Sequence, residues 1–169
     1  MRRTPTQLAC LGFIHEQPAS GYDILKAVRD GSLKPFLSAG QAAIYDGLRT
    51  LEKQGALVAN TVVQSEKPSK IIYSISTQGK NLFQEIARHL VNQDPDFRTT
   101  LLLVRFQKNL PSSLLQQAFS NQIRLLKQQW SANYDPDPSD EFLVAFKNGA
   151  TEVTKAQIKW IAEMQDALQ

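Results

Sequence analysis

Cysteine, histidine and long apolar runs are the features that this sequence has least of. Its single cysteine, Cys10, excludes a framework of disulfides within the chain and fits a reducing compartment. No apolar run approaches the ~20 residues that a membrane helix requires. Arg2 and Arg3 precede an amphipathic segment rather than the apolar core and cleavage site of a signal peptide. We therefore expect a cytoplasmic protein that does not contact a membrane.

Residues that carry out chemistry are also scarce. The two histidines, His15 and His89, lie on different predicted helices and have no Cys, His or carboxylate partner at metal-ligand spacing. No glycine-rich phosphate loop, nucleophile elbow or pair of catalytic carboxylates occurs, and residues 135–138 are typical of a loop. We expect neither an enzyme nor a protein with a metal or cofactor. For Cys10, on a predicted buried turn, core packing is favoured over redox sensing.

The composition is that of a globular protein with unevenly placed charge. The 169 residues are 42% hydrophobic and 21% charged, which suffices for one large or two small domains. Residues 1–92 hold 11 Lys and Arg against 7 Asp and Glu, whereas residues 93–169 hold 8 against 9. An excess of positive charge in the first part fits attraction to phosphates, although many solvated surfaces carry as much.

The stretch from Ser38 to Gly55 predicts a helix with two different sides. Three apolar residues recur at helical spacing on one side, and four polar residues recur every four positions on another. Ser38 is the expected N-cap, and Gly55 stands where a helix commonly ends in the left-handed conformation. The apolar side comprises Ile44, Leu48 and Leu51, and the polar side Gln41, Tyr45, Arg49 and Lys53. Such a helix is typical of proteins that read DNA.

The flanking segments complete a winged helix-turn-helix. Thr4 with Pro5, and Ser20, are expected to begin two earlier helices. Residues 57–64 and 70–75 predict two strands joined by a turn at residues 65–69. Lys67 and Lys70 flank a proline there, so a stiff basic wing can lie along a phosphate backbone; an ordinary solvated turn is the alternative.

The remainder of the chain predicts helices only. A fourth helix follows Ser76-Thr77 and ends near Asn92, and Asp94-Pro95-Asp96 is the expected domain joint. Further helices are expected over residues 97–108, from Pro111, and over residues 139–168. The predicted fold is therefore mainly α with a small β-wing: a DNA-binding domain over residues 1–93 and an all-helical dimerisation domain over residues 94–169.

Three amphipathic helices in the second domain make a thin core, so part of their apolar surface is expected to pair two copies. Trp130 and Trp160 are best explained by packing at the dimer core. The alternative hypothesis is that they flank a cavity for a small aromatic effector. The residues expected at the dimer interface are Phe119, Leu126, Trp130, Phe142, Phe146, Trp160, Ile161 and Met164.

Several short sequence motifs within residues 6–90 resemble motifs of the PadR-type transcriptional regulators. They are Ser20-Gly21-Tyr22-Asp23-Ile24, Ala43-Ile44-Tyr45 followed by Leu51-Glu52-Lys53-Gln54-Gly55, and Ile72-Tyr73-Ser74-Ile75-Ser76 with Gly79. The tail is similar to the branch with a longer helical C-terminal domain. Two positions depart from the family: Glu66-Lys67-Pro68 replaces the usual Gly-Arg-Pro of the wing, and Asp46 replaces a proline after the recognition tyrosine.

The resemblance implies a homodimeric regulator, expected to be a repressor, that binds an inverted repeat in a promoter. Each recognition helix would enter a major groove, with half-sites about one helical turn apart. Gln41 would pair with adenine, Ala42 would touch a thymine methyl, and Tyr45 and Arg49 would hold phosphates. The residues expected at DNA are Ser38, Gln41, Ala42, Tyr45, Arg49, Lys67, Lys70 and Tyr22.

Other interpretations of these residues stay open. Gln41 and Arg49 also fit an ordinary solvated helix face, and Tyr45 also fits a packing role with its hydroxyl at the rim. For Tyr22 a structural role is favoured over contact with DNA. The competing function is a winged-helix module that binds proteins and not DNA.

Overall fold

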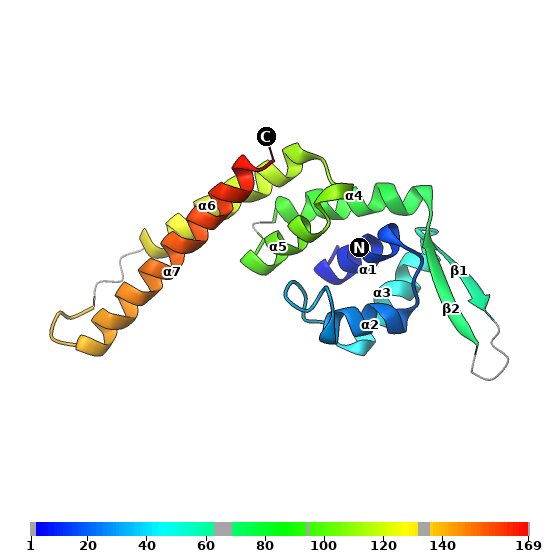
Figure 1. The fold of residues 1–169 in the computed structure, drawn as a ribbon, viewed down its shortest axis with the longest axis horizontal. Coiled ribbons are helices and arrows are strands. Elements are labelled where there is room, and N and C mark those ends of the chain that lie inside the picture. Colours follow the sequence, from blue (N-terminus) through cyan, green and yellow to red (C-terminus); the bar gives the residue numbers. More distant parts are fainter. Residues whose placement is uncertain (1–2, 63–68, 94, 132–135, 169) are drawn as a thin grey trace. The chain divides into compact units, whose positions relative to one another are not determined.

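The computed structural model of the chain describes residues 3–62, 69–93, 95–131 and 136–168, and side chains are not described for residues 129–131 (Figure 1). These residues form two compact units, 1–110 and 111–169. The fold is mostly helical with one two-stranded antiparallel sheet, as predicted. Within the described ranges, no helix combines the length and hydropathy that a membrane span requires.

Two capped helices open the first unit. Helix α1 (Pro5–Glu16) begins at Thr4, whose hydroxyl accepts from the backbone N–H of Gln7 at 3.3 Å while the Gln7 side chain accepts from the Thr4 N–H. Helix α2 (Gly21–Asp30) begins at Ser20 in the same way, with Asp23 as the reciprocal partner. Such capping boxes satisfy amides that the first helical turn leaves unpaired, and both predicted starts are confirmed.

Helix α3 (Gln41–Lys53) begins later than the sequence predicted. Its N-cap is Gly40, which has no side chain to accept a hydrogen bond, so the prediction of Ser38 as N-cap is wrong. The reason lies in the preceding loop, where Leu33 and Leu37 are buried and the backbone N–H of Leu37 bonds to the carbonyl of Leu33. We infer that packing of these two leucines holds the loop through Ser38 and that the helix begins only after it.

The end of α3 and the hairpin follow the predicted pattern. Gly55 adopts a φ of +69°, the left-handed conformation that glycine enters without steric cost. Strand β1 (Leu57–Val62) then pairs antiparallel with β2 (Lys70–Ile75), with Leu57 opposite Ile75; residues 63 and 64 of the predicted first strand lie outside the described residues. The two strands extend away from the helices of this unit (Figure 1).

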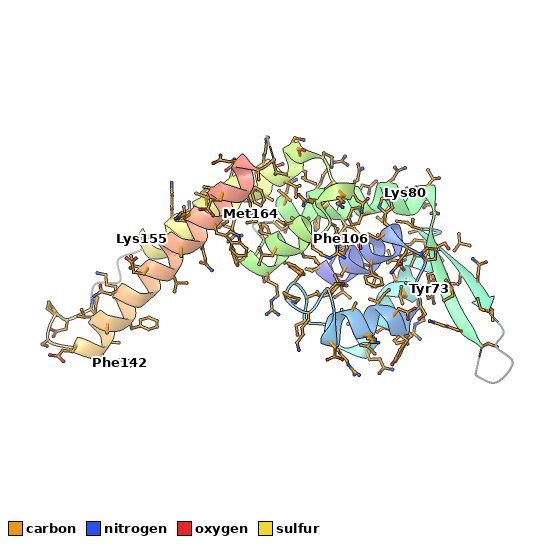
Figure 2. The ribbon with its side chains drawn as sticks, in the orientation of Figure 1. Tyr73, Lys80, Phe106, Phe142, Lys155 and Met164 are labelled. Atoms are coloured by element: carbon orange, nitrogen blue, oxygen red, sulfur yellow. The ribbon has the colours of Figure 1, made fainter. Side chains whose placement is uncertain are left out.

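A short backbone bridge ties the hairpin to the loop before α2. The N–H of Ala19 donates to the carbonyl of Tyr73 at 3.1 Å, and the N–H of Tyr73 donates back at 2.9 Å. Tyr73 itself is buried at the base of the hairpin (Figure 2). Because these bonds join β2 to the start of α2, the hairpin has a fixed direction at its base.

Helix α4 (Thr77–Val91) begins at the predicted cap Ser76, and α5 (Phe97–Arg105) begins at Asp96. A 3₁₀ turn, η1 (Gln107–Asn109), follows α5, so the helix predicted over residues 97–108 is shorter than expected. These elements group with the first compact unit, residues 1–110, which extends past the expected joint at residues 94–96. The division into a DNA-binding domain and a dimerisation domain stays a prediction.

The core of the first unit lies among α1, α3, α4 and α5. Its fully buried side chains include Leu8, Leu11, Ile14, Ile44, Leu48, Phe83, Ile86 and Phe106. Phe106 packs directly on the backbone of α1: a Cβ atom placed on Gly12 would lie 2.8 Å from the ring. This contact anchors the segment after α5 to α1 within the same unit.

The second unit consists of α6 (Ser112–Ser131) and α7 (Glu141–Asp166), which pack against each other. Helix α7 is capped by Asp140, whose carboxylate accepts from the N–H of Leu143 at 3.0 Å. At 26 residues it is slightly shorter than the predicted range of 139–168 and still much longer than an average helix.

Candidate nucleic-acid interface

Helix α3 separates a buried side from an exposed side, as its spacing predicted. Ile44, Leu48 and Leu51 have no solvent exposure. Gln41, Ala42, Tyr45 and Arg49 are exposed on the other side. A polar helix face held in place by a buried apolar stripe is what insertion into a groove of DNA requires.

Tyr45 is both exposed and packed. Its side chain is 36% exposed, yet a Cβ atom placed on Gly21 would lie 2.7 Å from its ring and 3.1 Å from Leu48. Only glycine at the first position of α2 allows α3 to approach this closely. The ring therefore fixes the contact between the two helices of the helix-turn-helix while its edge stays accessible.

Arg49 forms an ion pair with Asp46 one turn earlier on α3. Both side chains are highly exposed, at 72% and 64%, so the pair contributes little to stability. The pair does neutralise the positive charge of Arg49 in the free protein. Contact with a phosphate would therefore exchange one anionic partner for another.

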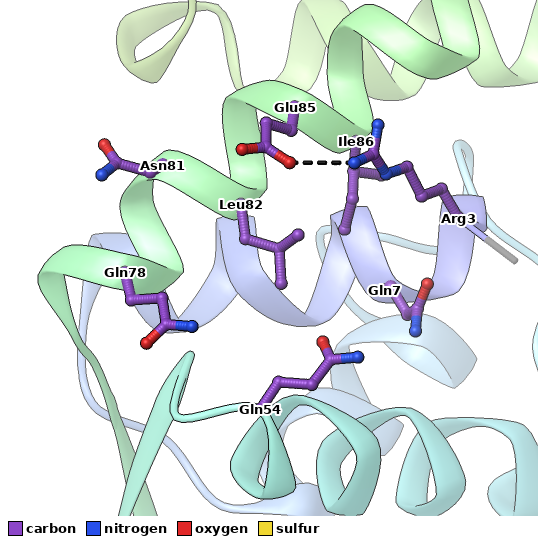
Figure 3. Close-up of a pocket in the computed structure, with 8 residues that line it drawn as sticks. All are labelled: Arg3, Gln7, Gln54, Gln78, Asn81, Leu82, Glu85 and Ile86. Carbon is purple, nitrogen blue, oxygen red and sulfur yellow. Dashed lines mark hydrogen bonds and ion pairs between the residues drawn. The ribbon is translucent and has the colours of Figure 1, made fainter. Parts of the chain in front are cut away.

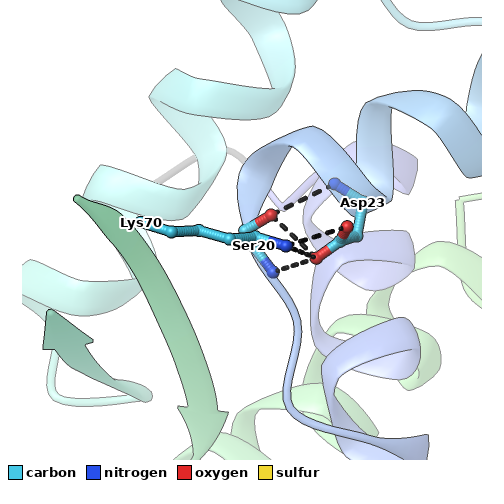
Figure 4. Close-up of polar contacts among 3 residues, drawn as sticks. All are labelled: Ser20, Asp23 and Lys70. Atoms are coloured by element: carbon cyan, nitrogen blue, oxygen red, sulfur yellow. Dashed lines mark hydrogen bonds and ion pairs between the residues drawn. The ribbon is translucent and has the colours of Figure 1, made fainter. Parts of the chain in front are cut away.

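Lys70 is paired with Asp23, so the wing is linked to α2 by side chains as well as backbone. The Lys70 ammonium lies 3.0 Å from Oδ2 of Asp23, whose carboxylate also accepts from the backbone N–H and hydroxyl of Ser20 (Figure 4). Burial raises the pKa of Asp23, but the hydrogen bonds from Ser20 and Lys70 outweigh it and lower that pKa below its ordinary value. Lys70 thus has a structural partner in the free protein.

The remaining residues expected at DNA differ in placement. Tyr22 is 64% exposed in the first turn of α2, which does not match the structural role that the sequence favoured. Ser38 is exposed in the loop before α3. Lys67 lies outside the described residues.

Cys10 belongs to the hydrophobic core. It is completely buried, and burial raises the pKa of its thiol to about 12. The thiolate that redox chemistry requires is therefore not formed at neutral pH, and core packing is the role that the structure gives this residue. Among the described residues, no group of His, Cys, Asp and Glu could hold a metal ion.

The residues expected at a dimer interface fall into two groups. Phe119, Leu126 and Ile161 are buried within the chain, so their surface is already covered. By contrast, Phe142, Phe146 and Trp160 on α7 are 78%, 56% and 46% exposed. Met164 is half-buried near the other end of α7 from Phe142 (Figure 2).

The expected effector site at Trp130 and Trp160 stays a prediction. The side chain of Trp130 lies outside the described part of the chain, and Trp160 is partly exposed on α7.

For three residues of this region the sequence did not predict the contacts that the structure shows. Asp46 stands three positions before Arg49, a helical ion-pair spacing that could have revealed it. Asp23 pairs with Lys70 across 47 positions of sequence, and Gly21 matters only because α3 packs on it. Both of these depend on tertiary structure that no local pattern contains.

Comparison with known proteins finds a family model that matches part of the chain. Residues 10–85 match the model described as "Transcriptional regulator PadR-like family". The chain is 32% identical over 87 residues to the negative transcriptional regulator PadR of Bacillus subtilis, covering 52% of this chain and 46% of that one. It is 36% identical over 80 residues to a probable transcriptional regulator of Mycobacterium tuberculosis, covering 47% of this chain and 40% of that one.

Each match thus covers less than half the length of the relative. Among solved structures, the chain is similar to Bacillus subtilis PadR in complex with operator DNA, at 23% identity and a TM-score of 0.45. That alignment covers 96% of this chain and 98% of the other.

Proposed function

We propose that this chain represses transcription by binding double-stranded DNA as a homodimer, because residues 10–85 match the model of the PadR-like family of transcriptional regulators. The family model and both curated relatives are described as transcriptional regulators. The observation that carries the proposal is the exposed face of α3, which presents Gln41, Ala42, Tyr45 and Arg49 from a helix whose other side is fully buried.

Each residue on this face has a role that its chemistry supports. The amide of Gln41 can pair with the N6 and N7 edge of adenine, and the methyl of Ala42 can contact the methyl of thymine. Arg49 can exchange Asp46 for a phosphate, since their pair is exposed. Tyr45 is held by Gly21, so its hydroxyl can reach a phosphate from a fixed position.

The exposed side of α7 supports pairing of two copies. Phe146, Val153 and Trp160 are spaced seven residues apart, and Phe142 lies four positions before the first of them. This is the spacing of a coiled-coil seam, which two antiparallel or parallel copies of α7 can bury. A symmetric dimer places two α3 helices on one duplex, and its expected operator is an inverted repeat with half-sites about 34 Å apart.

Repression is supported by the relative named as a negative transcriptional regulator. An effector that tunes the affinity for DNA would have to bind one arrangement of the dimer more tightly than another.

Selection of bound duplexes from a random pool tests the proposal directly. The expected result is an enriched inverted repeat whose affinity falls steeply as salt rises, because bound phosphates release counterions. Failure to retain any duplex at low salt would contradict DNA binding and favour a winged-helix module that binds proteins. A single enriched half-site would contradict the symmetric dimer while leaving DNA binding intact.

A further inference from the structure

A polar hollow of about 560 Å³ lies in the first unit, away from the exposed face of α3. Its lining comes from the start of α1, the residue after α3, and one side of α4: Arg3, Gln7, Gln54, Gln78, Asn81, Leu82, Glu85 and Ile86. This volume is within the range of sites that bind small molecules. The hollow therefore has room for a ligand.

Carboxamides dominate the polar part of this lining. The ends of Gln7, Gln54 and Gln78 turn toward the same space, and Asn81 stands at its rim (Figure 3). A carboxamide offers a donor and an acceptor side by side, so it pairs best with a ligand edge that offers the complementary pair. The Gln7 oxygen already accepts from the Thr4 N–H, which orients the Gln7 amide nitrogen.

The charges of the lining cancel. The Arg3 guanidinium lies 2.9 Å from the Glu85 carboxylate, and these two residues are the only charged members of the set. A ligand with a large net charge would gain little from this pair. Leu82 projects toward the hollow between the glutamines, so a flat apolar face can rest on it (Figure 3).

We propose that this hollow binds a purine base. A purine is neutral and flat, and its edges carry adjacent donors and acceptors that glutamine amides can pair with, as they do at the N6 and N7 edge of adenine. Gln54 and Gln78 come from different elements around this space, so their amides can engage more than one edge of a purine, and the Gln7 amide nitrogen can add a donor. A smaller pyrimidine has fewer such edges, and a simple aromatic ring has none.

Purine binding can be tested separately from contact with DNA. The lining contains none of the residues on the exposed face of α3, and Gln54, which follows the helix, lies about 20 Å along the helix axis from Gln41. The titration uses the protein without DNA, so its result is independent of the result on DNA.

Isothermal titration calorimetry of the full chain with adenine, adenosine and adenosine monophosphate tests this inference. We expect adenine or adenosine to bind with a dissociation constant below about 1 mM. If adenosine binds at least as tightly as adenine, the ligand class is a nucleoside bound through its base. If adenosine binds more weakly than adenine, the ligand class is the free base. The combined variant Gln54→Leu with Gln78→Leu should lose at least about tenfold in affinity, since two amide contacts disappear.

Gln93→Leu is the matched control, because Gln93 is an exposed glutamine just beyond α4 and outside the lining. This control should bind as the wild type does. Absence of binding by adenine, adenosine and the monophosphate would overturn the proposal. So would equal binding by the double variant, or equal binding of uracil or phenol by the wild type. Circular dichroism of each variant establishes that the helices are retained.

Discussion

The ring of Tyr45 lies against the backbone of Gly21, so that a single added carbon at position 21 would come within 2.7 Å of it. Gly21 is the first residue of α2, and Tyr45 belongs to the exposed face of α3. The distance between the two helices of the helix-turn-helix is therefore set by a residue that is also proposed to contact DNA. Folding and recognition share this contact.

Gly21→Ala should destabilise the fold by about 1–3 kcal/mol, because the new methyl group overpacks against Tyr45 and Leu48. Urea denaturation followed by circular dichroism measures the change. Gly47→Ala is the matched control: an added Cβ there meets only Cys10 and Thr6, at 3.9 and 4.0 Å. Because alanine has a higher helix propensity than glycine, Gly47→Ala should leave the free energy of unfolding unchanged or raise it by about 0.5–1 kcal/mol. Equal effects of the two substitutions would contradict the packing role of Gly21.

The bridge between Lys70 and Asp23 should make stability depend on pH in the acidic range. The pKa of Asp23 is lowered in the folded state, so its contribution is present above the ordinary carboxylate value of about 4 and is lost as pH falls below it. Asp23→Asn should flatten the fall in the unfolding free energy between about pH 5 and pH 2. Asp30→Asn, an exposed carboxylate in the same helix, serves as the control.

Lys70→Met separates the two sources of this effect, because it removes the ion pair and leaves the hydrogen bonds from Ser20. It should reproduce only part of the change seen in Asp23→Asn. An unchanged pH profile in both variants would show that the bridge does not contribute to stability.

Asp46→Asn should strengthen the binding of DNA of any sequence, because Arg49 is then free to meet a phosphate without first leaving a carboxylate. The salt dependence of binding should steepen by about one counterion. Glu52→Gln removes one negative charge elsewhere on α3 and measures the general effect of charge. A larger gain in Glu52→Gln than in Asp46→Asn would contradict a specific link between Asp46 and Arg49.

Phe146→Glu should convert the proposed dimer into monomers, because it places a charge in the apolar stripe of α7. Sedimentation velocity gives the oligomeric state directly, and affinity for an inverted repeat should fall with it because two linked reading helices bind more tightly than one. Asn148→Glu, exposed on the same helix and off the stripe, should remain dimeric. A Phe146→Glu protein that sediments as the wild type does would exclude this face as the interface.

Features decided within a few residues were predictable from the sequence. The caps at Thr4, Ser20 and Ser76 and the left-handed Gly55 follow from local hydrogen bonding and sterics, and the structure confirms them. Ser38 shows the limit of this reasoning, because burial of residues in the loop before α3 sets the start of that helix. Ser38 is a residue type that favours the N-cap position, but packing of the loop makes Gly40 the N-cap instead.

Features that join distant segments were not predictable. Lys70 was expected to contact DNA, but its pairing with Asp23 depends on the bridge that joins β2 to the residue before the N-cap of α2. Phe119 and Phe142 belong to similar apolar stripes, yet one is buried in the chain and the other is exposed. Periodicity identifies an apolar stripe, but only the packed structure tells which stripe is left for a partner.

The central claim is tested most directly by measuring affinity for DNA in the wild type, Gln41→Ala and Arg49→Ala. Each protein is titrated with a selected operator duplex and with a scrambled duplex over a range of salt concentrations. We predict that Gln41→Ala lowers affinity for the operator and leaves the scrambled duplex unchanged, with a loss of about 1–3 kcal/mol in discrimination. Arg49→Ala should weaken both duplexes alike and reduce the salt dependence by about one counterion. Wild-type affinity for both duplexes in both variants would contradict the assignment of α3 as the helix that reads DNA.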